Sequence, residues 1–285
     1  MEKPEELISI SDPGERGRSE HNVGDRLMVH VSNVFSWIYP ILMLVIVIQV
    51  FLRSFGRMDV GPGNQAWLDD MQWWLYGLAV LIGVGYAVTT NSHVRVDIFH
   101  DNFSKERKAR IEVFALAWLF LPFIILAWDL TFHYAVASVV SREGSDSPNG
   151  LHRLYLLKIA MNLTFVLIGM AIWAAYRRNL AHFKAPTLFN QLLYALPSVM
   201  FLINLAIFYV LYWFVRMTAG PDLRPNRITR EPIFDYFMVE DADGKMTEFT
   251  LLNIPIAKTV VMTIVVMALV LIVARLFAHK TEKDA

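Results

Sequence analysis

Long uncharged stretches constrain this chain more than any other feature of its sequence. Residues 34–52 form a run of 19 residues without a charged side chain. At about 1.5 Å per residue, a helix of this length crosses the roughly 30 Å hydrocarbon core of a bilayer. The whole chain is 55% hydrophobic and 18% charged, whereas a soluble domain usually carries about 25% charge. These observations predict an integral membrane protein.

Five further apolar runs repeat this pattern, so we expect an all-α integral membrane protein with about six transmembrane helices. Pro197 predicts a kink in the fifth span. The first 30 residues are polar and lack the apolar core of a signal peptide, so we expect the first span to act as its own membrane signal. The expected spans are 34–52, 71–92, 113–140, 159–176, 188–215 and 255–274.

The distribution of basic residues predicts the orientation of these spans. With both termini in the cytoplasm, the inner segments hold 15 Lys or Arg and the outer segments hold 11, as the positive-inside rule favours. We therefore expect a cytoplasmic tail over residues 1–31, a four-helix core over 32–180, and two additional helices over 181–285. The two additional helices would be joined by a periplasmic loop over residues 216–253.

Two β-prone runs in this periplasmic loop bracket Asp241-Ala242-Asp243-Gly244. Such runs around an Asp-Gly pair are typical of a β-hairpin. A calcium loop is the alternative, but it requires regularly spaced ligands and a terminal bidentate glutamate, and both are missing. The pattern favours a small β-hairpin.

Charged residues gather at both ends of the second span. Asp69 and Asp70 stand beside Trp67 at the start, where they suit either a helix amino terminus at the membrane surface or a contact to another subunit. His93, Arg95 and Asp97 alternate with valines after the span, which suits either a basic membrane stop or a docking motif. The residue types leave both pairs of alternatives open.

Several polar residues lie within or beside the expected spans, and such residues join helices more often than they bind solutes. Asp129 and His133 share one helix face but lie near the outer end of their span, away from the midplane. The spans show no repeated, broken helices of the kind that build a transport site. The other residues of this set are Gln49, Arg53, Asn162 and Asn204.

No residue pattern indicates a cofactor, a metal site or catalysis. The chain has no cysteine, which excludes disulfides, thiolate ligands and cysteine nucleophiles. Haem would need histidines facing each other within the spans, and only His133 among the eight histidines lies in one. One histidine and one carboxylate beside an arginine do not make a closed metal site at residues 93–97. We expect no cofactor and no enzymatic activity.

Three short motifs, in this order along the chain, carry a family resemblance. Gln49-Val50-x-x-Arg53 ends the first span, Trp67-x-Asp69-Asp70 precedes the second, and His93-Val94-Arg95-Val96-Asp97 follows it. The chain resembles the small permease (Q) subunit of tripartite ATP-independent periplasmic (TRAP) transporters. The acidic pair is usually Glu-rich in that family, so Asp-Asp departs from the pattern. Residues 143–148, followed by Lys158, also resemble the outer loop before the family's fourth span.

The resemblance covers residues 30–180, and the two further spans make this chain similar to enlarged Q subunits. It implies a non-catalytic scaffold subunit of a sodium-coupled transporter in the bacterial inner membrane. The implied partners are the large elevator (M) subunit and a periplasmic binding (P) protein that delivers an organic acid; no nucleic acid is implied. The resemblance implies no substrate ligand, and the structural or subunit-contact residues that it implies are Gln49, Arg53, Trp67, Asp69, Asp70, His93, Arg95 and Asp97.

Two functions of other classes are alternatives: a membrane-anchor subunit of a redox complex, and an autonomous carrier. A Soret band in the visible absorption spectrum would favour the redox anchor. Solute uptake by this chain alone in liposomes would favour the carrier.

Overall fold

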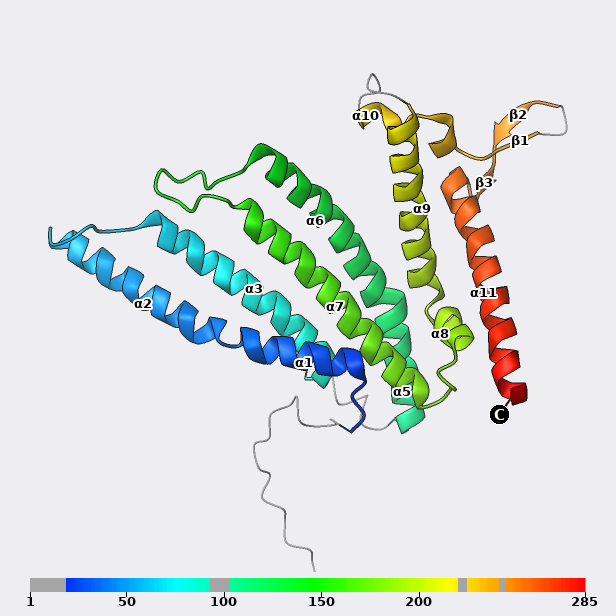
Figure 1. Cartoon of the computed structure of the whole chain (residues 1–285), viewed down its shortest axis with the longest axis horizontal. Coiled ribbons are helices and arrows are strands. Elements are labelled where there is room, and N and C mark those ends of the chain that lie inside the picture. The colour runs from blue at the N-terminus through cyan, green and yellow to red at the C-terminus, as the bar shows by residue number, and fades with distance from the viewer. Residues whose placement is uncertain (1–18, 93–102, 220–224, 241–243, 285) are drawn as a thin grey trace, which may run out of the picture. The chain divides into compact units, whose positions relative to one another are not determined.

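The computed structural model describes residues 19–92, 103–219, 225–240 and 244–284, and it divides the chain into two units, Met1–Lys184 and Ala185–Ala285. Six of its helical segments are long and apolar enough to cross a membrane. The predicted six-span, all-α architecture is therefore confirmed. The two units are shown in Figure 1 and are described separately.

The first unit contains four spans. Helix α1 (Val23–Phe35) leads through a short turn into α2 (Ile38–Arg57), and α3 (Ala66–Thr90) follows. The third span joins α5 (Lys105–Phe114), the π-helical segment η1 (Ala115–Phe120) and α6 (Leu121–Ser141); the fourth is α7 (Tyr155–Ala181). Helices α2, α3, α7 and α6 pack in that order, and α1 packs against both α3 and α7.

Helix α1 begins inside the segment that the sequence predicted as a tail over residues 1–31. Asn22 caps it, because its side-chain oxygen accepts hydrogen bonds from the backbone N–H groups of Gly24 and Asp25. The Asp25 carboxylate in turn accepts a hydrogen bond from the Asn22 N–H, which completes a capping box. Because of this cap, the helix begins at Val23, eight residues before the predicted end of the tail at residue 31.

The π-helical segment interrupts the third span without ending it. The N–H of Leu121 donates to the carbonyl of Leu116, five residues earlier, instead of the four residues of an α-helix. Pro122 follows at once and has no N–H of its own to offer the preceding turn. The helix from Lys105 to Ser141 is therefore continuous but contains one wider turn.

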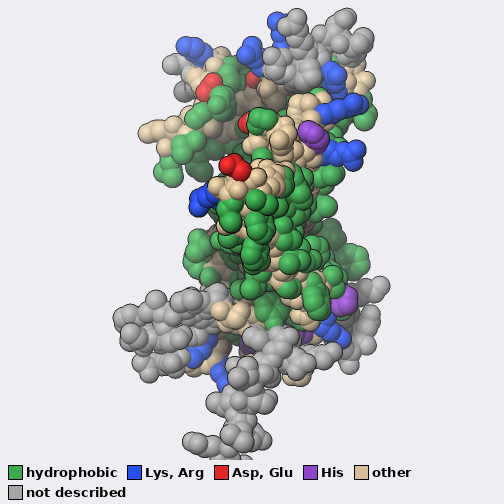
Figure 2. Space-filling view, turned by 90° about the vertical axis from the view of Figure 1, so that its left-hand side faces the viewer, with side chains coloured by type: hydrophobic (Ala, Val, Ile, Leu, Met, Phe, Trp, Pro, Cys, Tyr) green, Lys and Arg blue, Asp and Glu red, His purple; other side chains and the backbone are tan. Residues whose placement is uncertain are grey.

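The outer surface of α2 is almost entirely apolar. Only Val45 and Gln49 of this helix are buried, whereas large side chains such as Met43 and Val50 are exposed. Figure 2 shows this side of the molecule, where hydrophobic side chains cover the middle. Such a surface suits the hydrocarbon core of a bilayer.

The second unit contains two spans and a small β region. Helix α8 (Leu188–Tyr194) precedes α9 (Leu196–Thr218), which packs against α11 (Lys258–Asp284). The sequence predicted one kinked helix over 188–215, but the structure has a complete break at Ala195. Pro197 lies in the first turn of α9, where its missing N–H is tolerated.

Between α9 and α11 lie α10 (Pro225–Ile228), the 3₁₀ segment η2 (Pro232–Phe234) and two short hairpins. Strands β1 (Met238–Glu240) and β2 (Met246–Glu248) pair antiparallel, with Met238 opposite Glu248. This pairing confirms the predicted hairpin; its turn residues 241–243 lie outside the described residues. Strands β3 (Thr250–Leu251) and β4 (Ile254–Pro255) form a second hairpin that the sequence did not predict.

Candidate functional site

Two polar clusters lie at opposite ends of the helices of the first unit, and we name each after its central residue. The Asn64 cluster consists of Gln49, Arg53, Asn64 and Asp69, at the end where α2 passes into α3. The Asp25 cluster consists of Asn22, Asp25, Thr89 and Arg178, where α1, α3 and α7 meet.

The Asn64 side chain connects α2 to α3. Its Oδ1 accepts hydrogen bonds from Gln49 Nε2 at 2.5 Å and from Arg53 Nε at 2.9 Å. Its Nδ2 donates to Asp69 Oδ2 at 3.4 Å. Because Gln49 and Arg53 are one turn apart on α2, a single asparagine can receive both. Asn64 was not predicted from the sequence, although its place directly after Gly61-Pro62-Gly63 marks the end of the turn.

Arg53 and Asp69 form the exposed part of this cluster. Arg53 Nη2 lies 2.9 Å from Asp69 Oδ1, and both side chains remain partly exposed. Gln49 is buried, and its Nε2 also donates to the carbonyl of Gln65. Three of the residues singled out from the sequence, Gln49, Arg53 and Asp69, are thus brought into one network. Trp67 lies in the first turn of α3 and is 40% exposed.

Asp70, the neighbour of Asp69, faces a different partner. Its Oδ2 accepts a hydrogen bond of 2.8 Å from the N–H of Leu151, in the loop before α7. A larger residue than Gly150 would crowd this contact, because a Cβ there would lie 2.4 Å from Ser145 Cβ and 2.6 Å from the same carboxylate oxygen. The two adjacent acids therefore contact different partners: Asp69 bonds to α2, and Asp70 bonds to the loop over residues 142–154.

The same loop is fixed at its other end by an ion pair between Glu143 and Lys158, two residues that the sequence analysis had placed in one loop-and-helix pattern. The hydrogen bond from the Lys158 ammonium lowers the pKa of Glu143 below its usual value. Lys158 also lies over the ring of Tyr134, 3.5 Å from its centroid. The pair and the ring join α7 to α6 at this end.

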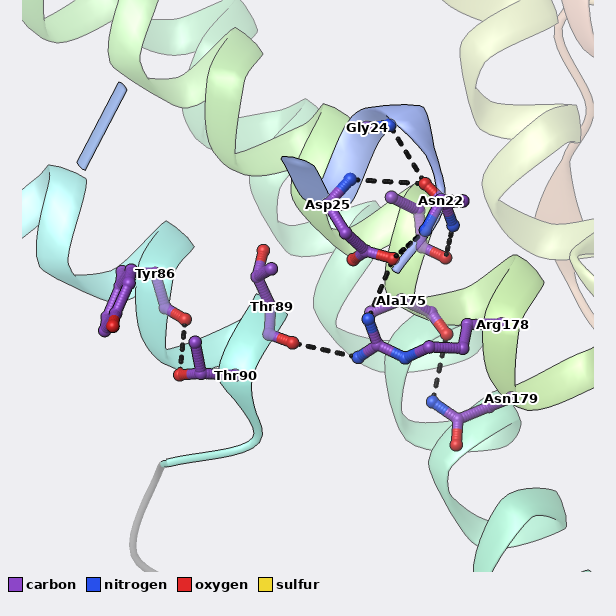
Figure 3. A network of polar contacts seen from close by, with 10 residues as sticks. Asn22, Gly24, Asp25, Tyr86, Thr89, Thr90, Ala175, Arg178 and Asn179 are labelled. Atoms are coloured by element: carbon purple, nitrogen blue, oxygen red, sulfur yellow. Dashed lines mark hydrogen bonds and ion pairs between the residues drawn. The ribbon is translucent and has the colours of Figure 1, made fainter. Parts of the chain in front are cut away.

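The Asp25 cluster is buried, unlike the Asn64 cluster. Asp25 is fully buried, and its Oδ2 lies 2.8 Å from Nη1 of Arg178. The Nη1 hydrogens are not directed at the carboxylate, so this contact is an ion pair without a well-aligned hydrogen bond. Nη2 of Arg178 donates to the carbonyl of Thr89 at 3.0 Å. Figure 3 shows the guanidinium between these two partners.

Asn22 extends this cluster to a second point on α7. Its side-chain Nδ2 donates to the carbonyl of Ala174 at 2.8 Å, while its backbone N–H binds Asp25. The sequence analysis missed both Asn22 and Asp25; the spacing Asn22-x-x-Asp25 was the available signal, because it is that of a capping box. Arg178 was not singled out from the sequence either.

The motif His93-Val94-Arg95-Val96-Asp97 lies outside the described residues, so the positions of His93, Arg95 and Asp97 are not part of this site description. Helix α3 ends at Thr90, with Asn91 in the left-handed conformation as its C-cap. Arg178 donates to the carbonyl of Thr89, which lies four residues before His93, the first residue of the motif.

Polar side chains within the spans form bonds between helices. Asn162 Nδ2 on α7 donates to the carbonyl of Trp128 at 2.9 Å and to Thr131 Oγ1 at 3.0 Å, both on α6. In the second unit, Asn204 Nδ2 on α9 donates to Thr263 Oγ1 on α11 at 3.0 Å. The prediction that these two asparagines join helices is confirmed. Among the described residues, no group of three or more His, Cys, Asp or Glu is placed to hold a metal ion.

Comparison with known families accounts for much of the first unit. Residues 42–148 match the model of the DctQ component of the tripartite ATP-independent periplasmic transporters. Over this region the chain is similar to the TRAP small permease component. The match includes Gln49, Arg53, Trp67, Asp69, Asp70 and the 93–97 motif, and it ends before α7. No match was found among the curated proteins or among the solved structures.

The DctQ family is a family of transporter components, not of enzymes. The predicted resemblance to the TRAP small permease is therefore confirmed over residues 42–148. Helix α7, which supplies Lys158, Asn162 and Arg178, and the whole second unit lie outside the matched residues.

Proposed function

We propose that this chain is the non-catalytic scaffold subunit of a sodium-coupled TRAP transporter that takes up organic acids. In this role it packs against the large elevator (M) subunit and anchors it in the bacterial inner membrane. A periplasmic binding (P) protein delivers the solute. The observation that carries the proposal is the DctQ match over residues 42–148 within a bundle of apolar helices.

The use of the polar span residues supports a scaffold rather than a carrier. The side-chain amides of Asn162 and Asn204 donate hydrogen bonds to neighbouring helices of this same chain. Gln49 donates to Asn64 and to the Gln65 backbone. A carrier needs polar groups near the midplane that are available to a solute, whereas the amide nitrogens of these three residues already donate hydrogen bonds within the chain.

The two ends of the first unit suit different sides of the membrane. We place the Asn64 cluster and the 142–154 loop in the periplasm, and the Asp25 cluster with both termini in the cytoplasm. This orientation rests on the excess of Lys and Arg in the inner segments, 15 against 11. The loop between α9 and α11 is then periplasmic, on the side where the binding protein acts.

In this proposal, five residues at this end form or support a subunit contact: the partly exposed Arg53 and Asp69, together with Trp67, Asp70 and the buried Gln49. His93, Arg95 and Asp97 form the corresponding contact at the inner end. An exposed ion pair adds little to the stability of the chain that carries it. Its charges are therefore available to a partner at small cost to the fold.

Co-purification tests both the function and the contact residues. The tagged full chain, expressed with its large membrane subunit, should retain that subunit through affinity and size-exclusion steps. Asp69→Asn and a His93→Ala/Asp97→Asn double variant should each lower the yield of the complex. Asp59→Asn is the matched control, because Asp59 is exposed and lies in the segment that joins α2 to α3.

The outcomes separate the two claims. Retention of the large subunit by wild type but equal yields for all variants would remove the contact role from these residues. If the wild-type chain brought down no large membrane subunit, or took up solute alone in liposomes, the scaffold function itself would be wrong.

A further inference from the structure

The β3–β4 hairpin of the second unit presents an apolar tip made of Leu251, Leu252 and Ile254. Leu252 is 89% exposed, and the other two side chains are also mostly exposed. Three large aliphatic side chains held in water at one point are an unfavourable arrangement for a soluble surface. The hairpin therefore needs a partner that the described residues of the chain do not supply.

The backbone at this tip holds a leucine in a strained, left-handed conformation. The turn has two residues, Leu252 and Asn253, with φ of 52° and 64°. Two consecutive positive φ values are typical of a type I′ hairpin turn, in which Asn and Gly are preferred at both central positions. Asn253 fits this preference, but Leu252 does not, because its Cβ is crowded there. Leu252 therefore occupies a position at which an asparagine would be less strained.

The tip is held rigidly at the start of a membrane span. Ile256 N–H donates to the carbonyl of Phe249 across the base of the hairpin, and Phe237 N–H donates to the carbonyl of Ile256. Two residues later α11 begins at Lys258, whose Nζ donates to the carbonyl of Pro232 at 2.6 Å. Figure 1 shows β3 next to the start of α11.

The charge pattern distinguishes this hairpin from the one beside it. Residues 249–257 contain no charged side chain, and the apolar span follows directly after Lys258. The β1–β2 hairpin, by contrast, carries Glu240, Lys245 and Glu248. An uncharged tip next to a span suits the boundary of a bilayer, whereas the charged β1–β2 hairpin does not.

We infer that Leu251, Leu252 and Ile254 insert into the outer boundary of the lipid bilayer and hold the β region against the membrane surface. The three side chains contact the glycerol and upper acyl region of the phospholipids around α11. Only the side chains reach the acyl region; the turn backbone stays at the glycerol level, outside the water-free hydrocarbon core, and can remain hydrated there. The inference rests on the second unit alone and does not depend on the proposed transporter function.

The chain has no cysteine, so single-cysteine labelling tests this inference directly. Leu252→Cys and, as a matched control, Met246→Cys on β2 would each carry an environment-sensitive NBD group on the full chain in phospholipid vesicles. Met246 is also an exposed apolar residue, but it stands on the charged hairpin. The label at 252 should emit at shorter wavelength, and doxyl-labelled lipids should quench it several-fold more than the label at 246. Aqueous iodide should give the reverse order.

Equal access of iodide to both positions in vesicles would overturn the inference. It would also fail if the label at 252 became protected only when the large membrane subunit or a binding protein was added, because the tip would then be a protein contact. Ile254→Cys provides a second labelling position, and the helical content by circular dichroism shows that each variant is folded.

Discussion

Arg178 of α7 lies 2.8 Å from the carboxylate of Asp25 in α1, and its second terminal nitrogen donates to the carbonyl of Thr89 in α3. One side chain thereby holds three helices that are far apart in sequence. Both charged groups are buried, so each depends on the other to offset the loss of hydration.

Removing either member of this pair should be costly. We expect Arg178→Met to lower the free energy of unfolding by about 3–5 kcal/mol, because the Asp25 carboxylate would remain buried without its counter-charge. Reversible unfolding in mixed detergent micelles measures this change. Arg177→Met is the control, because Arg177 is adjacent but exposed.

A double variant, Asp25→Asn with Arg178→Met, should recover part of the loss. With both charges gone, no uncompensated ion remains, so the double variant should be less destabilised than the sum of the two single variants. Additive losses in this cycle would show that the two side chains act independently.

Acidification should selectively weaken the loop over residues 142–154. The pKa of Glu143 lies below its ordinary value of 4.5 in the folded chain, because Lys158 donates a hydrogen bond to the carboxylate. A lowered folded-state pKa stabilises the protein above pH 4.5, and this contribution is lost as the pH falls through the folded value. The difference in apparent Tm between wild type and Glu143→Gln should therefore stay constant from neutral pH down to about pH 4.5 and should shrink below that value.

Asp146→Asn serves as the comparison for this titration, since Asp146 is exposed in the same loop. Its Tm difference from wild type should stay small throughout. A gap for Glu143→Gln that did not change between pH 7 and strongly acidic conditions would contradict the ionic role of the pair.

The hydrogen bond between Asn204 and Thr263 should stabilise the pairing of α9 with α11. We expect Asn204→Ala to cost about 1 kcal/mol, and a cycle with Thr263→Val to give a coupling of roughly 0.6 kcal/mol. Thr218→Val is the control, because the Thr218 hydroxyl bonds only to carbonyls of its own helix. A coupling indistinguishable from zero would mean that packing alone joins these helices.

The close approach of Gly56 and Gly63 should make the turn after α2 intolerant of larger residues. A Cβ on Gly56 would lie 2.3 Å from the Gly63 Cα, so Gly56→Ala should destabilise the fold by about 1–3 kcal/mol. Gly77→Ala is the matched variant, because a Cβ there meets nothing within 4 Å. It should be neutral or stabilising by up to about 1 kcal/mol; equal losses at both positions would refute the backbone contact.

The spans were predictable from the sequence because uncharged length alone decides whether a helix can cross a bilayer. The hairpin of β1 and β2 was predictable from local turn chemistry around Asp241–Gly244. The break at Ala195 was only partly predictable: Pro197 indicated a distortion, but whether a helix bends or stops depends on the packing of the turn before it.

The polar clusters were harder to predict, because their partners are distant in sequence. Gln49, Arg53 and Asp69 were recognised individually, but Asn64, which joins them, looked like an ordinary loop residue. Asp25 and Arg178 are separated by most of the first unit, and each taken alone resembles a charged residue at a membrane surface. Only the packing of α1 against α7 identifies them as partners.

The π-turn at Ala115–Phe120 sets the rotational phase of the third span. A hydrogen bond closed over five residues accommodates one residue more than an α-turn does. With uniform α-helical winding, every side chain beyond Leu121 would rotate by about 100° around the axis. Thr131, which accepts the amide of Asn162, would then point away from α7. A one-residue insertion, absorbed in a single turn, thus decides which face of this helix meets its neighbour.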